Sequence, residues 1–331
     1  MFRLERLDLS QMGLFFSSLS PPAVPSIPLP IRHDALIKGS FCGGSFPFFQ
    51  RRRGRPVNVS EHFRRFVEEI YDRYHHREMV PPDPLQCLYA YEDPAEREVA
   101  ALVAASLAVG RAQSIVQQVS AVLSRMGPKP ASFLKQADAE DVHRVCRGFR
   151  YRFFSENELR AFLGGVAETL RLYGSLESAM AHCLKRSKGD VVQALDLFAA
   201  HLARTAAADA VPKNRLVAVP SSGSACKRWH LFLRWMVRCD AVDPGGWSCL
   251  APRDLIVPVD THMFAIARTC RLTCRRQGDL KAALEITEGF RRIRPDDPVR
   301  YDFSLTRMAM KGKEFLDLWW SVSKPEKGEQ Q

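Results

Sequence analysis

The sequence predicts an all-α protein. Apolar residues recur at helical spacing through most of the chain, small capping residues precede these runs, and glycine ends several of them. No segment shows the sustained alternation of apolar and polar residues that is typical of a half-buried strand, and no repeat has solenoid spacing. We therefore expect six or more helices in a helical domain over residues 58–320, built as one body or as two lobes.

The two ends of the chain differ in composition from this domain. Residues 1–57 contain "SLSPPAVPSIPLPI", which is too rich in proline for a helix, and a short arginine cluster. We expect a disordered leader here, or an upstream extension from a misassigned start. Acids at Glu5 and Asp8 argue against a secretory signal. Residues 321–331 are expected to form a polar tail.

The first helices are predicted from their caps. "VSEHFRRFVEEIYDRYH" begins with Ser60 in a capping position. "DPAEREVAALVAAS" has Asp93 as its cap, a proline at the first helical position, and Glu96 three residues after the cap, which predicts a capping box. Gly110 separates this helix from the next one, which is expected to stop at Gly127.

Later segments continue the helical pattern. "DAEDVHRVCRG" is expected to end at Gly148, and "SENELRAFLGGVAETLRLYG" begins with a capping box from Ser155 to Glu158. "SLESAMAHCLKRSKG" and "DVVQALDLFAAHLARTAAA" each start with a small capping residue. Asp302 is the predicted cap of the last helical pattern.

Composition indicates the class of partner. The chain has 48 basic and 37 acidic residues and a net charge of +11, which favours a polyanion such as DNA or RNA. Its longest apolar runs are too short for a membrane span, so we expect no membrane contact. We also expect a cytoplasmic protein that is a monomer. Nine cysteines without a CxxC pair predict free thiols, no metal site and no cofactor.

The segment "VAVPSSGSACKRWHLFLRWMVRCD" combines a turn of small residues with basic and aromatic residues. Small residues let a backbone approach a ligand closely, and free amides at a helix start can hold a phosphate. The alternative is a core helix with its arginines at a solvated edge. The residues expected to contact nucleic acid here are Ser222, Gly223, Ser224, Ala225, Arg228 and Arg234.

Asp260 and His262 stand at the start of the helix predicted in "VPVDTHMFAIARTCRLT". An aspartate at this position is a good N-cap, and capping alone would explain it. The functional alternative is an acid that stabilises positive charge on a sugar or orients a nucleophile. His262 can serve in acid–base chemistry or be structural.

Two further stretches offer nucleic-acid contacts. "AASLAVGRAQSIVQQ" places Arg111 and Gln113 at a helix junction, where they can line a pocket or simply face solvent. "CRGFRYRFFSENE" interleaves Arg150 and Arg152 with aromatic residues. Such a mixture suits stacking on bases and contact with phosphates, although aromatic residues can also anchor a loop.

"GSACKR" at 223–228 and "VDTHMFAIART" at 259–269 together resemble the helix-hairpin-helix DNA glycosylase superfamily, of which endonuclease III is the familiar member. "GFRYRF", "GSACKRWHLFLRWMVRCDAVDPGGW" and "DPVRYDFSLTRMAMKG" resemble a bacterial family of unknown function allied to those enzymes, over residues 58–312. The resemblance implies a glycosylase-like helical fold, DNA more than RNA as partner, and base-excision repair. It further implies that Asp260 is the catalytic acid and Lys227 the Schiff-base lysine of bifunctional members.

The sequence departs from this pattern in three respects. Ala225 stands where the hairpin usually has its second glycine, and the chain between Lys227 and Asp260 is lengthened by "AVDPGGWSCLAPRD". No four-cysteine motif follows "MAMKGKEFLDLWW", so no iron–sulfur cluster is expected. Two hypotheses therefore remain: a glycosylase, possessing lyase activity if Lys227 attacks the sugar, or a non-catalytic DNA- or RNA-binding module on the same scaffold.

Overall fold

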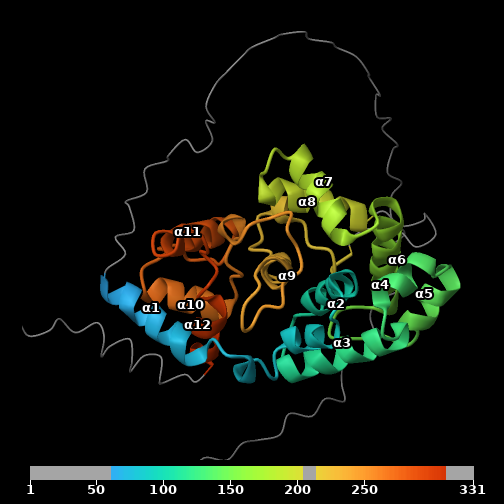
Figure 1. Ribbon diagram of the computed structural model, residues 1–331, viewed down its shortest axis with the longest axis horizontal. Coiled ribbons are helices and arrows are strands. Elements are labelled where there is room, and N and C mark those ends of the chain that lie inside the picture. The colour runs from blue at the N-terminus through green and yellow to red at the C-terminus, as the bar shows by residue number, and fades with distance from the viewer. Residues whose placement is uncertain (1–60, 204–213, 311–331) are drawn as a thin grey trace, which may run out of the picture. The chain divides into compact units, whose positions relative to one another are not determined.

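The computed structural model describes residues 61–203 and 214–310, and every regular element in these two ranges is a helix. The predicted all-α class and the expectation of six or more helices are confirmed. The α-helices (Figure 1) are α1 (Glu61–Tyr74), α2 (Pro94–Ser106), α3 (Ala112–Met126), α4 (Pro130–Gln136), α5 (Ala139–Cys146), α6 (Glu156–Tyr173), α7 (Leu176–Arg186), α8 (Val191–Leu202), α9 (Lys227–Val237), α10 (Thr261–Thr269), α11 (Leu280–Arg291) and α12 (Asp302–Ala309). The short 3-10 helices are η1 (Arg77–Met79), η2 (Pro84–Ala90), η4 (Pro220–Ser222) and η5 (Pro252–Asp254).

Several helix ends form as the sequence predicts. Asp93 caps α2 by accepting a hydrogen bond from the amide of Ala95. Ser155 and Glu158 form both halves of the predicted capping box at α6. Gly127 follows α3 with φ of 77°, a conformation that costs glycine little because it has no Cβ.

Glu96 does not complete the capping box predicted at α2. Its buried carboxylate accepts hydrogen bonds from the Ser132 hydroxyl and from the amide of Ala131 (2.6 Å), at the start of α4. A helix start carries partial positive charge and unpaired amides, which a carboxylate satisfies. The spacing from Asp93 to Glu96 fits a capping box, but the Glu96 carboxylate bonds to the start of α4 instead.

Glu98 does the same for α7. It accepts hydrogen bonds from the amides of Leu176 (2.6 Å) and Glu177 (3.0 Å) and from the indole of Trp247 (3.0 Å). Burial raises the pKa of this carboxyl to about 7, against the opposing effect of these donors. Helix α2 thus fixes the starts of two other helices through acids two positions apart.

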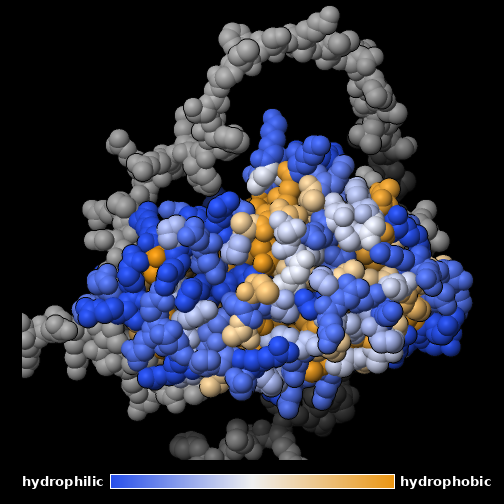
Figure 2. All heavy atoms as spheres, viewed as in Figure 1, coloured by the Kyte–Doolittle hydropathy of each residue, from blue (hydrophilic) through white to orange (hydrophobic). Residues whose placement is uncertain are grey.

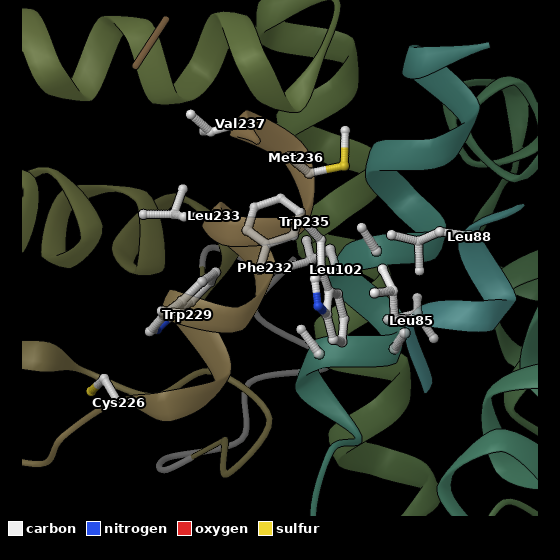
Figure 3. Close-up of a cluster of buried hydrophobic side chains, with 14 of the residues drawn as sticks. Leu85, Leu88, Leu102, Cys226, Trp229, Phe232, Leu233, Trp235, Met236 and Val237 are labelled. Atoms are coloured by element: carbon white, nitrogen blue, oxygen red, sulfur yellow. The ribbon is translucent and has the colours of Figure 1, made fainter. Parts of the chain in front are cut away.

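Helices α2 and α9 form the interior of the fold. Trp229, Phe232 and Trp235 of α9 are buried, and α9 packs against α2. Figure 3 shows α9 side chains together with Leu85 and Leu102. Full burial of one large apolar side chain contributes about 1.5–3 kcal/mol, so this cluster holds α9 against α2.

The other helices pack around this centre. Helix α12 packs against α1 and α10, α6 packs against α4 and α5, and α7 pairs with α8. On the face in Figure 2, hydrophobic residues gather in the middle, below α7 and α8, with hydrophilic residues on both sides. Among the described helices, none has the length and apolar character that crossing a membrane requires.

Asp302 was predicted as an N-cap, and the structure shows that it is not one. It is the first residue of α12, the cap position is held by Tyr301, and the carboxylate is buried against Arg234. The leader (1–57), the cap predicted at Ser60 and the tail (321–331) lie outside the described residues.

Candidate active site

Asp260 caps helix α10. Its backbone is extended (φ −110°, ψ −171°), and its Oδ1 accepts a hydrogen bond from the amide of Met263 at 2.8 Å. The preceding residues 255–259 are buried, and the Val257 amide donates to the hydroxyl of Thr287 at 3.0 Å. The capping interpretation is confirmed. It occupies one carboxylate oxygen and leaves Oδ2 for another partner.

That partner is Lys227, the first residue of α9. Its Nζ lies 3.1 Å from Asp260 Oδ2, and the two side chains are 33% and 20% exposed. The longer segment between the two residues therefore does not separate them. An acid at a helix start is stabilised as its anion by the helix dipole. The pair is open to solvent on one side, so a ligand can reach it.

The turn before α9 contains two left-handed residues. Gly223 has φ of 86°, with nothing within 4 Å of the position that a Cβ would take. Cys226 has φ of 45° and ψ of 39°, whereas Ala225 avoids positive φ. Ala225 is therefore compatible with the turn, because the strained position falls one residue later. Left-handed non-glycine residues cost free energy and often occur at functional sites.

The amides of this turn are partly used within it. The Ser222 amide donates to the Val219 carbonyl at 3.1 Å, and the Gly223 amide donates to the Pro220 carbonyl at 3.0 Å. The hydroxyl of Ser224 accepts from the Cys226 amide. These bonds do not support phosphate binding by the amides of Ser222 and Gly223.

Arg228 is directed into the protein. Its guanidinium donates to the carbonyls of Ser106 (2.9 Å) and Arg215 (2.7 Å), and burial lowers its pKa. A guanidinium committed to backbone carbonyls is a structural tie between α2 and the start of α9. The predicted phosphate contact by Arg228 is not supported.

Arg234 is even less available. It is 3% exposed and lies between Asp243, at 3.1 Å, and Asp302. Arg238 continues this network by pairing with Asp243 and with Asp297. The predicted phosphate contact by Arg234 is not supported, because both of its sides face buried carboxylates.

Asp302 is a member of the site that sequence reasoning missed. Burial raises the pKa of its carboxyl to about 6, Arg234 opposes this rise, and the charges of Asp260 and Lys227 act on it with opposite signs. The only signal in the sequence is an acid in "RYDF", which predicts a cap and not a buried ion pair.

A second group of predicted residues lies around Gly110. The guanidinium of Arg152 lies 3.0 Å from the position that a Gly110 Cβ would take, and the Tyr151 hydroxyl donates to the Val109 carbonyl at 2.7 Å. The junction with Arg111 and the arginine-rich loop are thus neighbours. The side chains exposed here are Arg111, Gln113, Arg150 and Arg152.

Phe153 joins this exposed group. It is 46% exposed, and the Arg215 guanidinium lies 5.4 Å from its ring centroid. Arg228 lies 5.7 Å from the ring of the adjacent Phe154, which connects the loop to the start of α9. An exposed aromatic ring among guanidiniums is a surface suited to nucleobases and phosphates.

A cavity of about 630 Å³ lies beside this surface. Its walls include Phe153, Asp196, Val219 and Ser222, but neither Lys227 nor Asp260. His262 is exposed on the first turn of α10. Among the residues that the structure describes, no three His, Cys, Asp or Glu side chains are grouped to hold a metal ion.

Comparison with known proteins gives the family. No curated protein and no solved structure matches the chain. Residues 83–311, which contain both halves of the Lys227–Asp260 pair, match the family described as "Protein of unknown function (DUF2400)". The chain therefore belongs to this family.

Proposed function

We propose that this protein binds DNA and removes a base from it, as DNA glycosylases do, with Asp260 stabilising positive charge on the sugar. The observation that carries the proposal is the 3.1 Å contact between Lys227 and Asp260 at the starts of two helices. The resemblance of the "VDTH" segment and of the turn before α9 to glycosylases gives this contact its chemical meaning.

The reaction needs one carboxylate in a fixed position. As the bond between C1′ and the base nitrogen breaks, its electron pair leaves with the base and positive charge develops on the sugar. Asp260 is held at Oδ1 by the Met263 amide, and its Oδ2, which also faces Lys227, is directed to that charge. A water molecule supplies the hydroxyl to C1′, and the departing base takes up a proton.

Lys227 has two possible parts in this scheme. As an ammonium beside Asp260, it orients the carboxylate. As a neutral amine, it attacks C1′ and forms a covalent adduct, which would make the enzyme a lyase as well. Reduction with borohydride during turnover distinguishes the two, since only the adduct is trapped.

The DNA surface proposed for this activity consists of the exposed loop residues and not the arginines of α9. Arg111, Arg150 and Arg152 are exposed, and Phe153 offers a ring for stacking. The target base must leave the duplex stack, which costs a few kcal/mol and costs least at a damaged pair.

The test uses the full chain and duplexes that carry deaminated, oxidised or alkylated bases. We expect base release from at least one duplex, and a loss of about 10²-fold or more in Asp260→Asn with DNA affinity retained. Asp190→Asn is the matched control, because Asp190 caps α8 in the same way. Asparagine keeps the oxygen that caps the helix, so equal loss in both variants would mean that the effect comes from lost charge at a helix start and not from the position of Asp260 in the site.

The second candidate function is DNA or RNA binding without catalysis. The placement of the exposed surface favours it, because Arg111, Arg150, Arg152 and Phe153 are open to solvent. The cavity beside them is lined by neither Lys227 nor Asp260. Tight, salt-sensitive binding without base release from any duplex would favour this alternative.

A further inference from the structure

One side of α9 carries three basic residues, of which Lys227 is partly exposed and His230 and Arg234 are buried. Lys227, His230 and Arg234 follow each other at spacings of three and four, which places them along one side of a helix. Lys227 meets Asp260 at the start of α10, and Arg234 meets Asp302 at the start of α12. His230 lies between them on the stripe, and burial lowers its pKa to about 4, so it is neutral at physiological pH.

The two ion pairs are close enough to act on each other. Helix α10 packs against α12, and the charges of Asp260 and Lys227 both act on the Asp302 carboxyl. Asp302 also pairs directly with Arg234, and Arg234 in turn pairs with Asp243. Two ion pairs, one partly exposed and one buried, therefore lie along the same side of α9.

The buried charges beside Asp302 form a network of two arginines and two aspartates. Arg234 pairs with both Asp302 and Asp243, and Arg238 pairs with Asp243 as well. Asp302 therefore shares its guanidinium partner with a second carboxylate, and its negative charge also attracts other cations nearby. One such cation is the ammonium of Lys227, which is paired with Asp260.

We propose that Asp302 is a positioning residue for the Lys227–Asp260 pair. From the first turn of α12, its buried carboxylate adds negative potential that holds the Lys227 ammonium against Asp260. The same potential favours positive charge on a sugar bound in front of the pair. This catalytic meaning rests on the proposed function, whereas the electrostatic coupling does not.

Coupling can be measured without any substrate. The carboxyl titration of Asp302 is followed by NMR in the full chain labelled at aspartate carboxyl carbons, with signals assigned by Asp302→Asn. Lys227→Gln should raise the pKa of Asp302 and Asp260→Asn should lower it, each by at least about 0.5, because an attractive and a repulsive charge are removed in turn. Identical titrations in all three proteins would overturn the inference.

Asp297→Asn is the matched control. Asp297 pairs with Arg238 at the far end of the same network, so this variant removes an acid from a buried arginine without touching Asp302. We expect the Asp302 titration to move less in this variant than in the two site variants. An equal movement would mean that Asp302 responds to the whole network, which contradicts a specific tie to the pair.

Activity gives the second readout. On a duplex from which the protein releases a base, Asp302→Asn should lower kcat by about 10-fold or more and change KM by less than about 3-fold, because it acts in the transition state. Asp297→Asn should retain kcat. Coupled titrations without base release from any duplex would leave the inference standing and contradict the proposed function. Uncoupled titrations in a protein that does release a base would contradict the inference and leave the proposed function standing.

Discussion

The ion pair between Glu158 and Arg215 anchors the approach to the candidate site. Glu158 is buried on α6 and its Oε1 lies 2.7 Å from Arg215 Nε. The carbonyl of Arg215 in turn accepts the hydrogen bond from Arg228 next to Lys227. Glu158→Gln removes this anchor while keeping the size of the side chain and its capping ability.

The magnitude follows from the protonation equilibrium of Glu158. The side-chain hydrogen bonds from Arg215 lower the pKa of Glu158 from 4.5 to about 2. At about 1.36 kcal/mol for each pKa unit, this is about 3 kcal/mol, which we reduce to about 2 kcal/mol because Arg215 is 47% exposed. The folded-state pKa is the lower one. The contribution is therefore complete above the unfolded value and is lost as pH falls towards about 2.

Urea unfolding monitored by tryptophan fluorescence measures this contribution. We expect Glu158→Gln to lower the free energy of unfolding by about 2 kcal/mol near pH 7, and the gap from wild type to shrink by about 1 kcal/mol near pH 3.5. Glu140→Gln is the control, because its pair with Arg147 is exposed and worth under about 1 kcal/mol. A gap that does not change with pH would mean that the ionised carboxylate of Glu158 does not contribute this stability.

Three further predictions concern the fold and the partner. Gly165→Ala should destabilise the protein by roughly 3 kcal/mol or prevent folding, because its Cβ would lie 1.9 Å from the Leu202 carbonyl oxygen where α6 meets α8; thermal unfolding checks this, and an unchanged Tm would contradict it. Asp93→Ala should cost about 1 kcal/mol in urea unfolding through loss of the α2 cap, and a loss near zero would mean that Pro94 alone sets this end. The logarithm of the DNA association constant should fall with the logarithm of salt concentration, and Arg150→Ala with Arg152→Ala should reduce the slope by about 2; an unchanged slope would remove these residues from the interface.

The helices were predictable because their signals are local. Asp93, Ser155 and Asp260 cap the helices that follow them. Gly110 lies between α2 and α3, and Gly127 follows the last residue of α3. Caps and glycine stops depend on neighbouring residues in the chain, so a sequence pattern contains them. The contact between Lys227 and Asp260 joins two segments that are distant in the chain, and no cap or glycine stop predicts it.

The arginines of α9 were not predictable in this way. On a helix with aromatic residues, a row of arginines resembles a solvated edge or a phosphate-binding face. Arg228 is instead satisfied by the carbonyl of Ser106, and Arg234 by Asp302, residues that are distant in sequence. Glu96 differs from its prediction for the same reason, since its partners belong to α4. Buried polar side chains are assigned by tertiary partners that no local pattern contains.

If the Asp260 carboxylate stabilises positive charge on a sugar in DNA, as proposed, the protein should bind a cationic sugar analogue more tightly than a neutral one. The most direct measurement compares the affinity for two duplexes, one with a cationic pyrrolidine in place of a sugar and one with a neutral tetrahydrofuran. We predict that wild type and Asp190→Asn prefer the cationic duplex by about 10²-fold or more, and that Asp260→Asn loses this preference while still binding the neutral duplex. Equal affinity of the wild-type protein for the two duplexes, or a preference that survives in Asp260→Asn, would contradict this role of Asp260.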